Sequence, residues 1–401
     1  MKDIFSAERV NTGRQLEFDL VKAVTIVLMI WTHTYEALST GFEPSLSAIT
    51  SDVRGSITGA VTLMFCMGIG LSYTRHNSAK ECIQRGAKLL TIGFTLLLCR
   101  EVIPVLLSSW ILNCPENLAY LALGVSVDIL QFAGLAFLFV GCLKKLRIGN
   151  VGMLIISIAL SVLGTLLQGV STGCYPVDQF LGFFWGTESD SYFPFFNWFI
   201  FVAAGQWFGD KYQFLQDKKR FHAISLLVGA ILCSAYIYVS FNIEQSIFKG
   251  LTSEIFLGHR PFFDAIVCLP INVGLISLFY FIGQLIPQKS IPVLIHPSKH
   301  INQYYCISWV IIQFIVYFSL IPEGLCSDAQ VIIVWICILA ATILSAVIYS
   351  KYLKERTEAF FGKHGVFWTV FVWTVCIASF ILAMCLFDEY PNMMNGYDIG
   401  I

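Results

Sequence analysis

Charged residues are scarce in this sequence of 401 residues. They make up 13% of the chain, and hydrophobic residues make up 57%. Soluble domains carry about 25% charged residues, so half of the usual polar surface is missing and the surface must face lipid. This scarcity excludes an ordinary soluble protein. The net charge of −1 gives no indication of a nucleic-acid partner, and we expect none.

The sequence also lacks the cysteine spacing of a zinc site or a disulfide framework. It has 13 cysteines, but most lie inside apolar runs, where cysteine behaves as a small hydrophobic residue. No pair has zinc-ligand spacing, and we expect no metal. Only Cys114, Cys174 and Cys326 fall in segments predicted outside the membrane, so one disulfide could form and none is required.

Internal repeats, low-complexity tracts and long linkers are absent as well. The first sixteen residues are polar and have no secretory signal with a cleavage site, so the first apolar run is predicted to be an uncleaved anchor. We therefore interpret 1–401 as a single domain, with core helices at about 14–210 and further helices at 222–387.

Long apolar runs dominate what is present. A hydrocarbon core about 30 Å thick needs roughly 20 apolar residues of helix. On that criterion the sequence predicts an all-α, polytopic membrane bundle of about eleven transmembrane helices. The predicted spans lie near 18–38, 57–74, 87–108, 118–142, 151–170, 192–208, 222–241, 262–285, 302–320, 329–350 and 366–387.

Lysine and arginine are distributed unevenly between the loops, which predicts the orientation. With the N-terminus in the cytoplasm, nearly all basic residues fall in inside segments, as the positive-inside rule requires. The basic residues left outside are Arg54, Arg100, Lys249 and Arg260. The acidic C-terminal segment is then predicted to lie outside.

Ionisable side chains inside apolar spans are costly unless paired or solvated, so they mark candidate sites. Lys22 and His33 of the first span are eleven residues apart, close to three turns and about 16 Å of rise. They share a face at different depths, which would suit one ligand lying along the helix. The structural alternative is that Asp19 pairs with Lys22 at i, i+3, and that His33 is a packing residue. Spacing alone leaves the two interpretations even.

The third span carries two further charged pairs. Arg85 and Lys88 open it, and either ordinary inside positive charge or a grip on phosphate explains them. Arg100 and Glu101 stand near its outer end. Because adjacent residues on a helix point about 100° apart, we expect these two side chains not to bridge each other, and one or both to face a cavity.

Two later spans contain polar residues in apolar surroundings. Asp128 and Gln131 share a face of the fourth predicted span, and a carboxylate without a partner at that depth favours function. Asn197 and Trp198 could line a site, although interfacial anchoring would also explain the tryptophan.

Four segments resemble a known group of enzymes. DLVKAVTIVLMIWTH resembles the opening helix of the transmembrane acyltransferase superfamily, in which a basic residue, ten others and a histidine recur; these are Lys22 and His33 here. RGAK at 85–88 is similar to the Arg-x-x-Arg of the acyltransferase-3 branch. DILQFAGLAFLF and YFPFFNWFIFVAAGQWFG resemble helices of the heparan-α-glucosaminide N-acetyltransferase branch, which the span count also suits.

The resemblance covers roughly the first 210 residues, with departures. Asn197 stands where the heparan branch prefers proline, and Ala23 where its first helix has glycine after the basic residue. Both departures bear on the identity of the acceptor more than on membership of the superfamily.

The resemblance implies acetyl-CoA as the acyl donor, entering from the cytoplasm. Its cofactor-binding residues would be Lys22, Arg85, Lys88 and Arg14. The thioester would lie near His33, which would act as general base or through an acetyl-imidazole. Glu36 or Asp128 would orient the imidazole ring.

The acceptor implied is an amino sugar or glycan outside the membrane. Its candidate contacts are Arg100, Glu101, Gln131, Asn197 and Trp198. Membrane lipid is the other expected partner, and the sequence leaves open whether the protein forms a homo-oligomer. The expected location is a bacterial inner membrane. O-acetylation of a surface polysaccharide competes within this class. A proton-coupled secondary transporter is the alternative from another class, although transporters usually show paired repeats. A non-catalytic membrane scaffold is a third hypothesis, but it gives no reason for the Lys22–His33 spacing.

Overall fold

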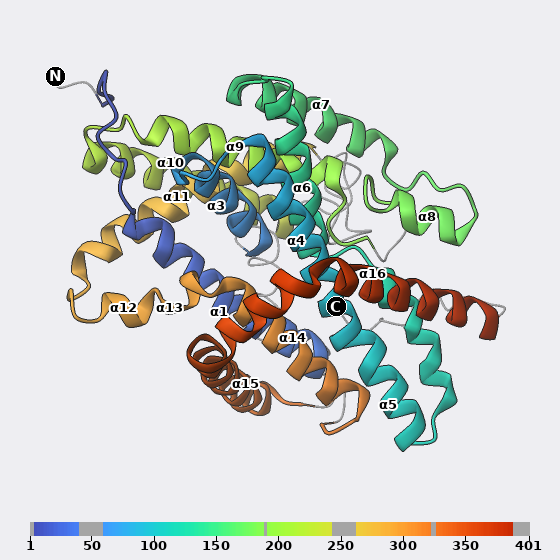
Figure 1. The fold of residues 1–401 in the computed structure, drawn as a ribbon. Helices are drawn as coiled ribbons and strands as arrows, with labels where there is room; N and C mark the ends of the chain where they lie inside the picture. Colours follow the sequence, from blue (N-terminus) through green and yellow to red (C-terminus); the bar gives the residue numbers. More distant parts are fainter. Residues whose placement is uncertain (1–3, 40–58, 188–190, 243–261, 322–325, 388–401) are drawn as a thin grey trace. The chain divides into compact units, whose positions relative to one another are not determined.

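The computed structural model describes residues 4–39, 59–187, 191–242, 262–321 and 326–387 (Figure 1). The all-α prediction is confirmed, since the named elements of these residues are all helical. The helices are α1 (Leu16–Leu38), α3 (Gly59–Tyr73), α4 (Ala79–Leu97), η1 (Leu98–Val102), α5 (Ile103–Ile111), η2 (Pro115–Val125), α6 (Ile129–Lys145), α7 (Asn150–Leu167), α8 (Tyr175–Leu181), α9 (Phe195–Tyr212), α10 (Lys218–Asn242), α11 (Phe262–Leu285), α12 (Ile291–Leu294), α13 (His296–Lys299), α14 (Ile301–Tyr317), α15 (Asp328–Ile348), η3 (Tyr349–Leu353) and α16 (Lys354–Leu386).

Each predicted span overlaps at least one of these helices. Five helical runs of the described residues are long and apolar enough to cross a membrane. They are Ala79–Ile111, Asn150–Leu167, Lys218–Tyr238, Phe262–Leu285 and Asp328–Leu386. The count of eleven and the orientation stay predictions, and Arg54, Lys249, Arg260 and the acidic C-terminal residues lie outside the described residues.

Two predicted boundaries differ from the structure for local reasons. The third helix begins at Ala79, eight residues before the predicted span, because Ser78 and Glu81 form a capping box: Glu81 accepts from the Ser78 N–H at 2.9 Å, and Ser78 Oγ accepts from the Glu81 N–H at 3.3 Å. The predicted 118–142 span is divided. Residues 115–125 form the 3₁₀ helix η2, and α6 starts only at Ile129.

The described chain divides into two compact units, which we treat separately. Unit 1 comprises Met1–Thr25, Val53–Lys88 and Val127–Lys299, and unit 2 comprises Ile26–Asp52, Leu89–Ser126 and His300–Ile401. Helix α1 contributes its first part to unit 1 and its second part to unit 2. The single-domain organisation stays a prediction.

Unit 1 is built on closely crossing helices. Helix α3 packs along α9, as Figure 1 shows, and α10 packs along α11. A Cβ added at Gly205 would lie 2.0 Å from the Phe65 carbonyl oxygen, and one added at Gly68 would lie 2.1 Å from that of Val202. Small residues let membrane helices approach in this way, so glycine is needed at both positions.

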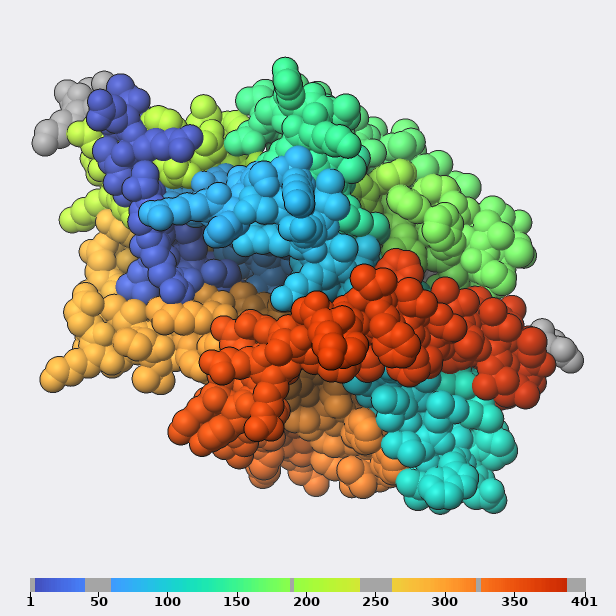
Figure 2. All heavy atoms as spheres, in the orientation of Figure 1, coloured from blue at the N-terminus to red at the C-terminus, as the bar shows by residue number. Residues whose placement is uncertain are grey.

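In unit 2 the second part of α1 contacts α14 and α15. Helix α16 packs along η2, and α14 contacts both α15 and η1. Figure 2 shows α16 as a band of side chains on the visible face, and this helix exposes large apolar groups such as Val366 and Phe367, which are 82% and 68% exposed. Apolar side chains on the outside are the pattern of a surface in lipid.

Candidate active site

His33 lies in the second part of α1, one turn before Glu36. Its Nδ1 is 2.9 Å from Glu36 Oε2. A carboxylate only accepts hydrogen bonds, so in the neutral imidazole Nδ1 carries the proton and Nε2 has the lone pair. The two side chains are 24% and 37% exposed, so a ligand can reach them. The pair is arranged as a base with an orienting carboxylate.

Trp309 of α14 links His33 to Arg100. The indole ring lies 4.2 Å from the imidazole ring between centroids, and the guanidinium carbon of Arg100 lies 4.5 Å from the indole centroid. The indole therefore holds the imidazole in place and binds the cation through its π-electrons. The sequence analysis identified His33 and Arg100 but missed Trp309, because a contact between distant segments leaves no local pattern.

Arg100 and Glu101 form an ion pair, so the prediction that they would not bridge is wrong. Arg100 Nε is 2.9 Å from Glu101 Oε1, and both side chains are almost fully buried. The reason lies in the backbone: Leu98–Val102 is a π-helical turn, η1, inserted between α4 and α5. A π turn changes the angle between neighbouring side chains, and such turns are frequent at functional sites.

Helix α14 also completes the surroundings of Glu101. The Tyr317 hydroxyl donates to Glu101 Oε2 at 2.8 Å, and Gln313 Nε2 donates to Oε1 at 3.2 Å. The Tyr317 ring in turn lies 5.7 Å from that of Tyr120. Glu101 thus has partners on both oxygens, as a buried carboxylate requires.

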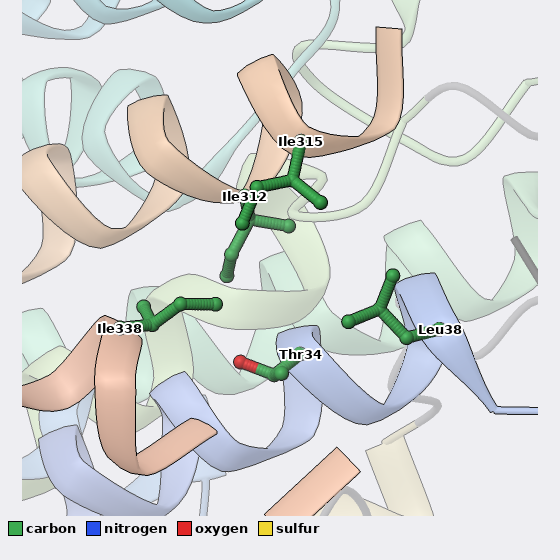
Figure 3. A pocket seen from close by; sticks show the side chains of 5 residues that line it. All are labelled: Thr34, Leu38, Ile312, Ile315 and Ile338. Atoms are coloured by element: carbon green, nitrogen blue, oxygen red, sulfur yellow. The ribbon is translucent and has the colours of Figure 1, made fainter. Parts of the chain in front are cut away.

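An apolar crevice lies one turn beyond His33 (Figure 3). The side chains come from α1, α14 and α15 and converge on a space of about 140 Å³. They are Thr34, Leu38, Ile312, Ile315 and Ile338. The space has no room for a water molecule, and the Thr34 hydroxyl donates to the Ile30 carbonyl within α1. The crevice is therefore packing and not the place where a sugar would bind.

In unit 1, the Asp19 carboxylate pairs with two basic residues near the start of α1. Its Oδ1 lies 3.1 Å from Lys22 Nζ, so the pairing that the sequence left open is confirmed. Asp19 also accepts from Arg14, which raises the pKa of that guanidinium, and from Ser298 Oγ at 2.8 Å. Lys22 and Arg14 meet at one carboxylate, and Ser298 was missed because it comes from the distant α13.

A second buried network of unit 1 also escaped the sequence analysis. Glu17 accepts from the Tyr212 hydroxyl and, at 2.9 Å, from Lys218 Nζ. The Tyr212 oxygen is 2.8 Å from His222 Nε2, and His222 Nδ1 is 2.9 Å from Ser277 Oγ. Both nitrogens of this fully buried imidazole are engaged. The network connects α1, α9, α10 and α11. Its polar groups bond one another, as expected of a network that stabilises the fold.

The other predicted cofactor residues lie on the exposed part of α4. Arg85 and Lys88 are both exposed, and the Arg85 guanidinium carbon is 6.0 Å from the Phe137 ring centroid.

A separate pocket of about 570 Å³ lies where α9 joins α10, within the size range of ligand sites. It is lined by Val10, Asn11, Leu215, Gln216, Asp217, Lys218, Lys219 and Tyr280.

Asp128 and Gln131 belong to the start of α6 and not to the middle of a span. Asp128 is the N-cap of the helix, and its carboxylate accepts from the Ile129 N–H at 2.6 Å. Helix capping therefore explains the buried carboxylate of Asp128, and the sequence did not reveal this. Gln131 is 1% exposed, and its amide has no hydrogen-bond partner among the described residues. It stays a candidate contact for a polar ligand.

Asn197 and Trp198 are buried near the start of α9. Asn197 lies against Gly164 of α7, where an added Cβ would stand 2.2 Å from Asn197 Oδ1. The Trp198 ring lies 4.7 Å from Phe193 and 5.5 Å from Phe201. Burial among aromatic rings shows that Trp198 is not an interfacial anchor, and its role in binding stays a prediction.

These features define a helical membrane protein with a partly exposed histidine–carboxylate pair suited to proton transfer. Residues 14–243, more than half of the chain, match the family model described as heparan-alpha-glucosaminide N-acetyltransferase, catalytic. The chain belongs to this family, which confirms the resemblance found in the sequence. No curated protein and no solved structure matches it.

The membership identifies the protein as an acyltransferase of the membrane, with a glycan or amino sugar as the acceptor class. The family uses acetyl-CoA as its donor in general. The described residues contain no group of three or more histidine, cysteine, aspartate or glutamate side chains that could hold a metal ion. All thirteen cysteines, Cys114, Cys174 and Cys326 among them, have free thiols.

Proposed function

We propose that this protein transfers an acetyl group from cytoplasmic acetyl-CoA to an amino sugar or glycan on the extracytoplasmic side, with His33 as the general base. The observation that carries the proposal is the bond between His33 Nδ1 and Glu36, because it directs the basic Nε2 away from the carboxylate. Membership of the N-acetyltransferase family supplies the reaction class.

The step balances without a further reactant. The acceptor amine attacks the thioester carbonyl carbon while His33 Nε2 takes a proton from the amine nitrogen. The carbon–sulfur bond then breaks, the amide forms, and the proton held by His33 passes to the sulfur of the departing CoA. Glu36 stabilises the imidazolium formed between these two proton transfers.

Lys22, Arg14, Arg85 and Lys88 are the proposed contacts of the CoA phosphates. The eleven-residue spacing of Lys22 and His33, about 16 Å along a helix, would suit one ligand that extends from the one residue to the other. The bond from Lys22 to Asp19 would position its ammonium group for an anion. Arg100, Glu101, Gln131, Asn197 and Trp198 remain the proposed acceptor contacts.

The test is a titration of acetyl-CoA against thermal stability in detergent, followed by a transfer assay with glucosamine and its glycosides. A ligand at a hundred times its Kd adds about 2.7 kcal/mol of stability. We expect this shift in the wild type and in Lys363→Ala, which changes an exposed lysine, and a reduced shift in Lys22→Ala. Lys219→Ala distinguishes phosphate binding in the 570 Å³ pocket from binding at Lys22.

His33→Ala should bind acetyl-CoA but transfer the acetyl group about 10³-fold more slowly or worse. His76→Ala is its matched control, because His76 Nδ1 also bonds a carboxylate, Glu81, at 2.8 Å, but its side chain is 78% exposed. If no acyl-CoA stabilises the wild type at saturation, the acetyltransferase proposal is wrong. Reconstitution in vesicles, with acetyl-CoA and acceptor on opposite sides, tests the sidedness.

A further inference from the structure

The indole of Trp309 has a polar atom that the fold does not use. Its Nε1 is buried and has no hydrogen-bond partner among the described residues. A buried donor without a partner is costly, and such groups are rare enough in folded proteins to need an explanation. A ligand that provides the missing acceptor is one explanation.

Position distinguishes this donor from a second one of the same kind. Trp335 of α15 also has a buried Nε1 without a partner in the described part of the chain. Its ring, however, packs edge-on against Trp31, with centroids 5.4 Å apart. The ring of Trp309 lies 4.2 Å from that of His33, so the indole that carries this N–H packs against the proposed base.

The surroundings of Trp309 fix its orientation. Arg100 lies against the indole at 4.5 Å, and Arg100 is itself held by Glu101. The donor is therefore preorganised by neighbours that occupy the ring and not the N–H. Preorganised donors are effective where charge develops during a reaction, because they need no rearrangement at that moment.

We infer that Trp309 is a catalytic residue whose indole N–H donates to the carbonyl oxygen of the acetyl group during transfer. This inference rests on the proposed function, and it assigns a role to α14, which lies outside the matched segment 14–243. As the amine nitrogen bonds to the carbonyl carbon, the π-electron pair moves onto the oxygen, where the N–H stabilises it. When the carbon–sulfur bond breaks, the pair returns and the oxygen becomes that of the amide.

The test compares Trp309→Phe with Trp335→Phe under steady-state conditions. Each variant keeps an aromatic ring and removes one buried N–H that has no partner among the described residues. We expect Trp309→Phe to lower kcat about 10²-fold, the typical effect of removing one such donor, with KM for acetyl-CoA and for the acceptor changed less than threefold. Trp335→Phe should keep the wild-type kcat.

Three results would overturn the inference. Equal kcat values for the two variants would show that the N–H takes no part. A raised acceptor KM with unchanged kcat would mean that Trp309 binds the sugar instead. Loss of the acetyl-CoA thermal shift in Trp309→Phe would mean that the residue supports the binding site and not the reaction. If the wild type itself transfers no acetyl group, the proposed function is wrong. This result is distinguishable from a failure of the inference about Trp309, in which the wild type is active.

Discussion

The two histidine sites of this protein differ in how completely they are satisfied. His222 in unit 1 has a partner on each ring nitrogen, Tyr212 and Ser277, and is fully buried. His33 in unit 2 is partly exposed and bonds Glu36 through Nδ1. The comparison teaches that a buried histidine with both nitrogens engaged serves the fold, whereas the role proposed for His33 needs a basic nitrogen that a ligand can reach.

The largest expected effect is on the reacting side of this comparison. His33→Ala should lower kcat by about 10³-fold or more, within the 10²–10⁴ range of general base catalysis, which corresponds to about 4 kcal/mol of barrier. His222→Ala should instead lower the midpoint of thermal unfolding and leave the kcat of the folded fraction nearly unchanged. The reverse pattern would exchange the roles of the two histidines.

Breaking the buried ion pair should have the next largest effect. Glu101→Gln leaves the Arg100 cation buried without its counter-charge, and we expect a loss of about 3 kcal/mol of unfolding free energy. Denaturant or thermal unfolding in detergent measures it. Asp210→Asn removes the partner of Arg9 from a surface pair at 3.4 Å and should cost less than about 1 kcal/mol. Equal losses would show that burial of the Arg100–Glu101 pair is not important.

Glu36→Gln sharpens the comparison, because it keeps the shape of the His33 pair and removes its charge. The imidazolium then loses its stabilising partner, and kcat should fall roughly 30-fold, or about 2 kcal/mol. The acetyl-CoA thermal shift should stay as in the wild type. Glu81→Gln makes the same change beside the exposed His76 and should leave kcat unaltered.

Tyr212→Phe has the smallest expected effect. It removes one hydroxyl that bonds both Glu17 and His222, so two buried groups each lose a partner. We expect about 1–2 kcal/mol less unfolding free energy, with kcat and both KM values unchanged. A fall in kcat without a fall in stability would assign the network of unit 1 a part in the reaction.

The sequence predicted what hydropathy and helical spacing encode. The positions of the apolar helices followed from window length, and the i, i+3 spacing gave the pairing of Asp19 with Lys22 as one of two interpretations, which the structure confirms. The remainder depends on irregular backbone or on distant segments. The π turn at Leu98–Val102 brought Arg100 to Glu101, against the regular helical angle, and the break before Ile129 made Asp128 a cap.

The missed residues share one property: their partners are far away in the chain. Trp309 and Tyr317 of α14 reach His33 and Glu101 from more than 200 residues away, and Ser298 reaches Asp19 in the same way. A tryptophan or tyrosine in an apolar helix has the same local pattern whether it packs against lipid or completes a site. Only the tertiary arrangement distinguishes the two.

The π turn also makes the site dependent on chain length at one point. A homologous chain with one residue fewer between Leu98 and Val102 would keep its hydrophobic profile, and its regular helix would run from Ala79 to Ile111. Everything after the deletion would rotate by about 100°, so the side chains of α5 would change their facing relative to those that precede the turn. Conservation of residue number in this turn, and not only of residue type, is therefore the feature to examine when relatives are aligned.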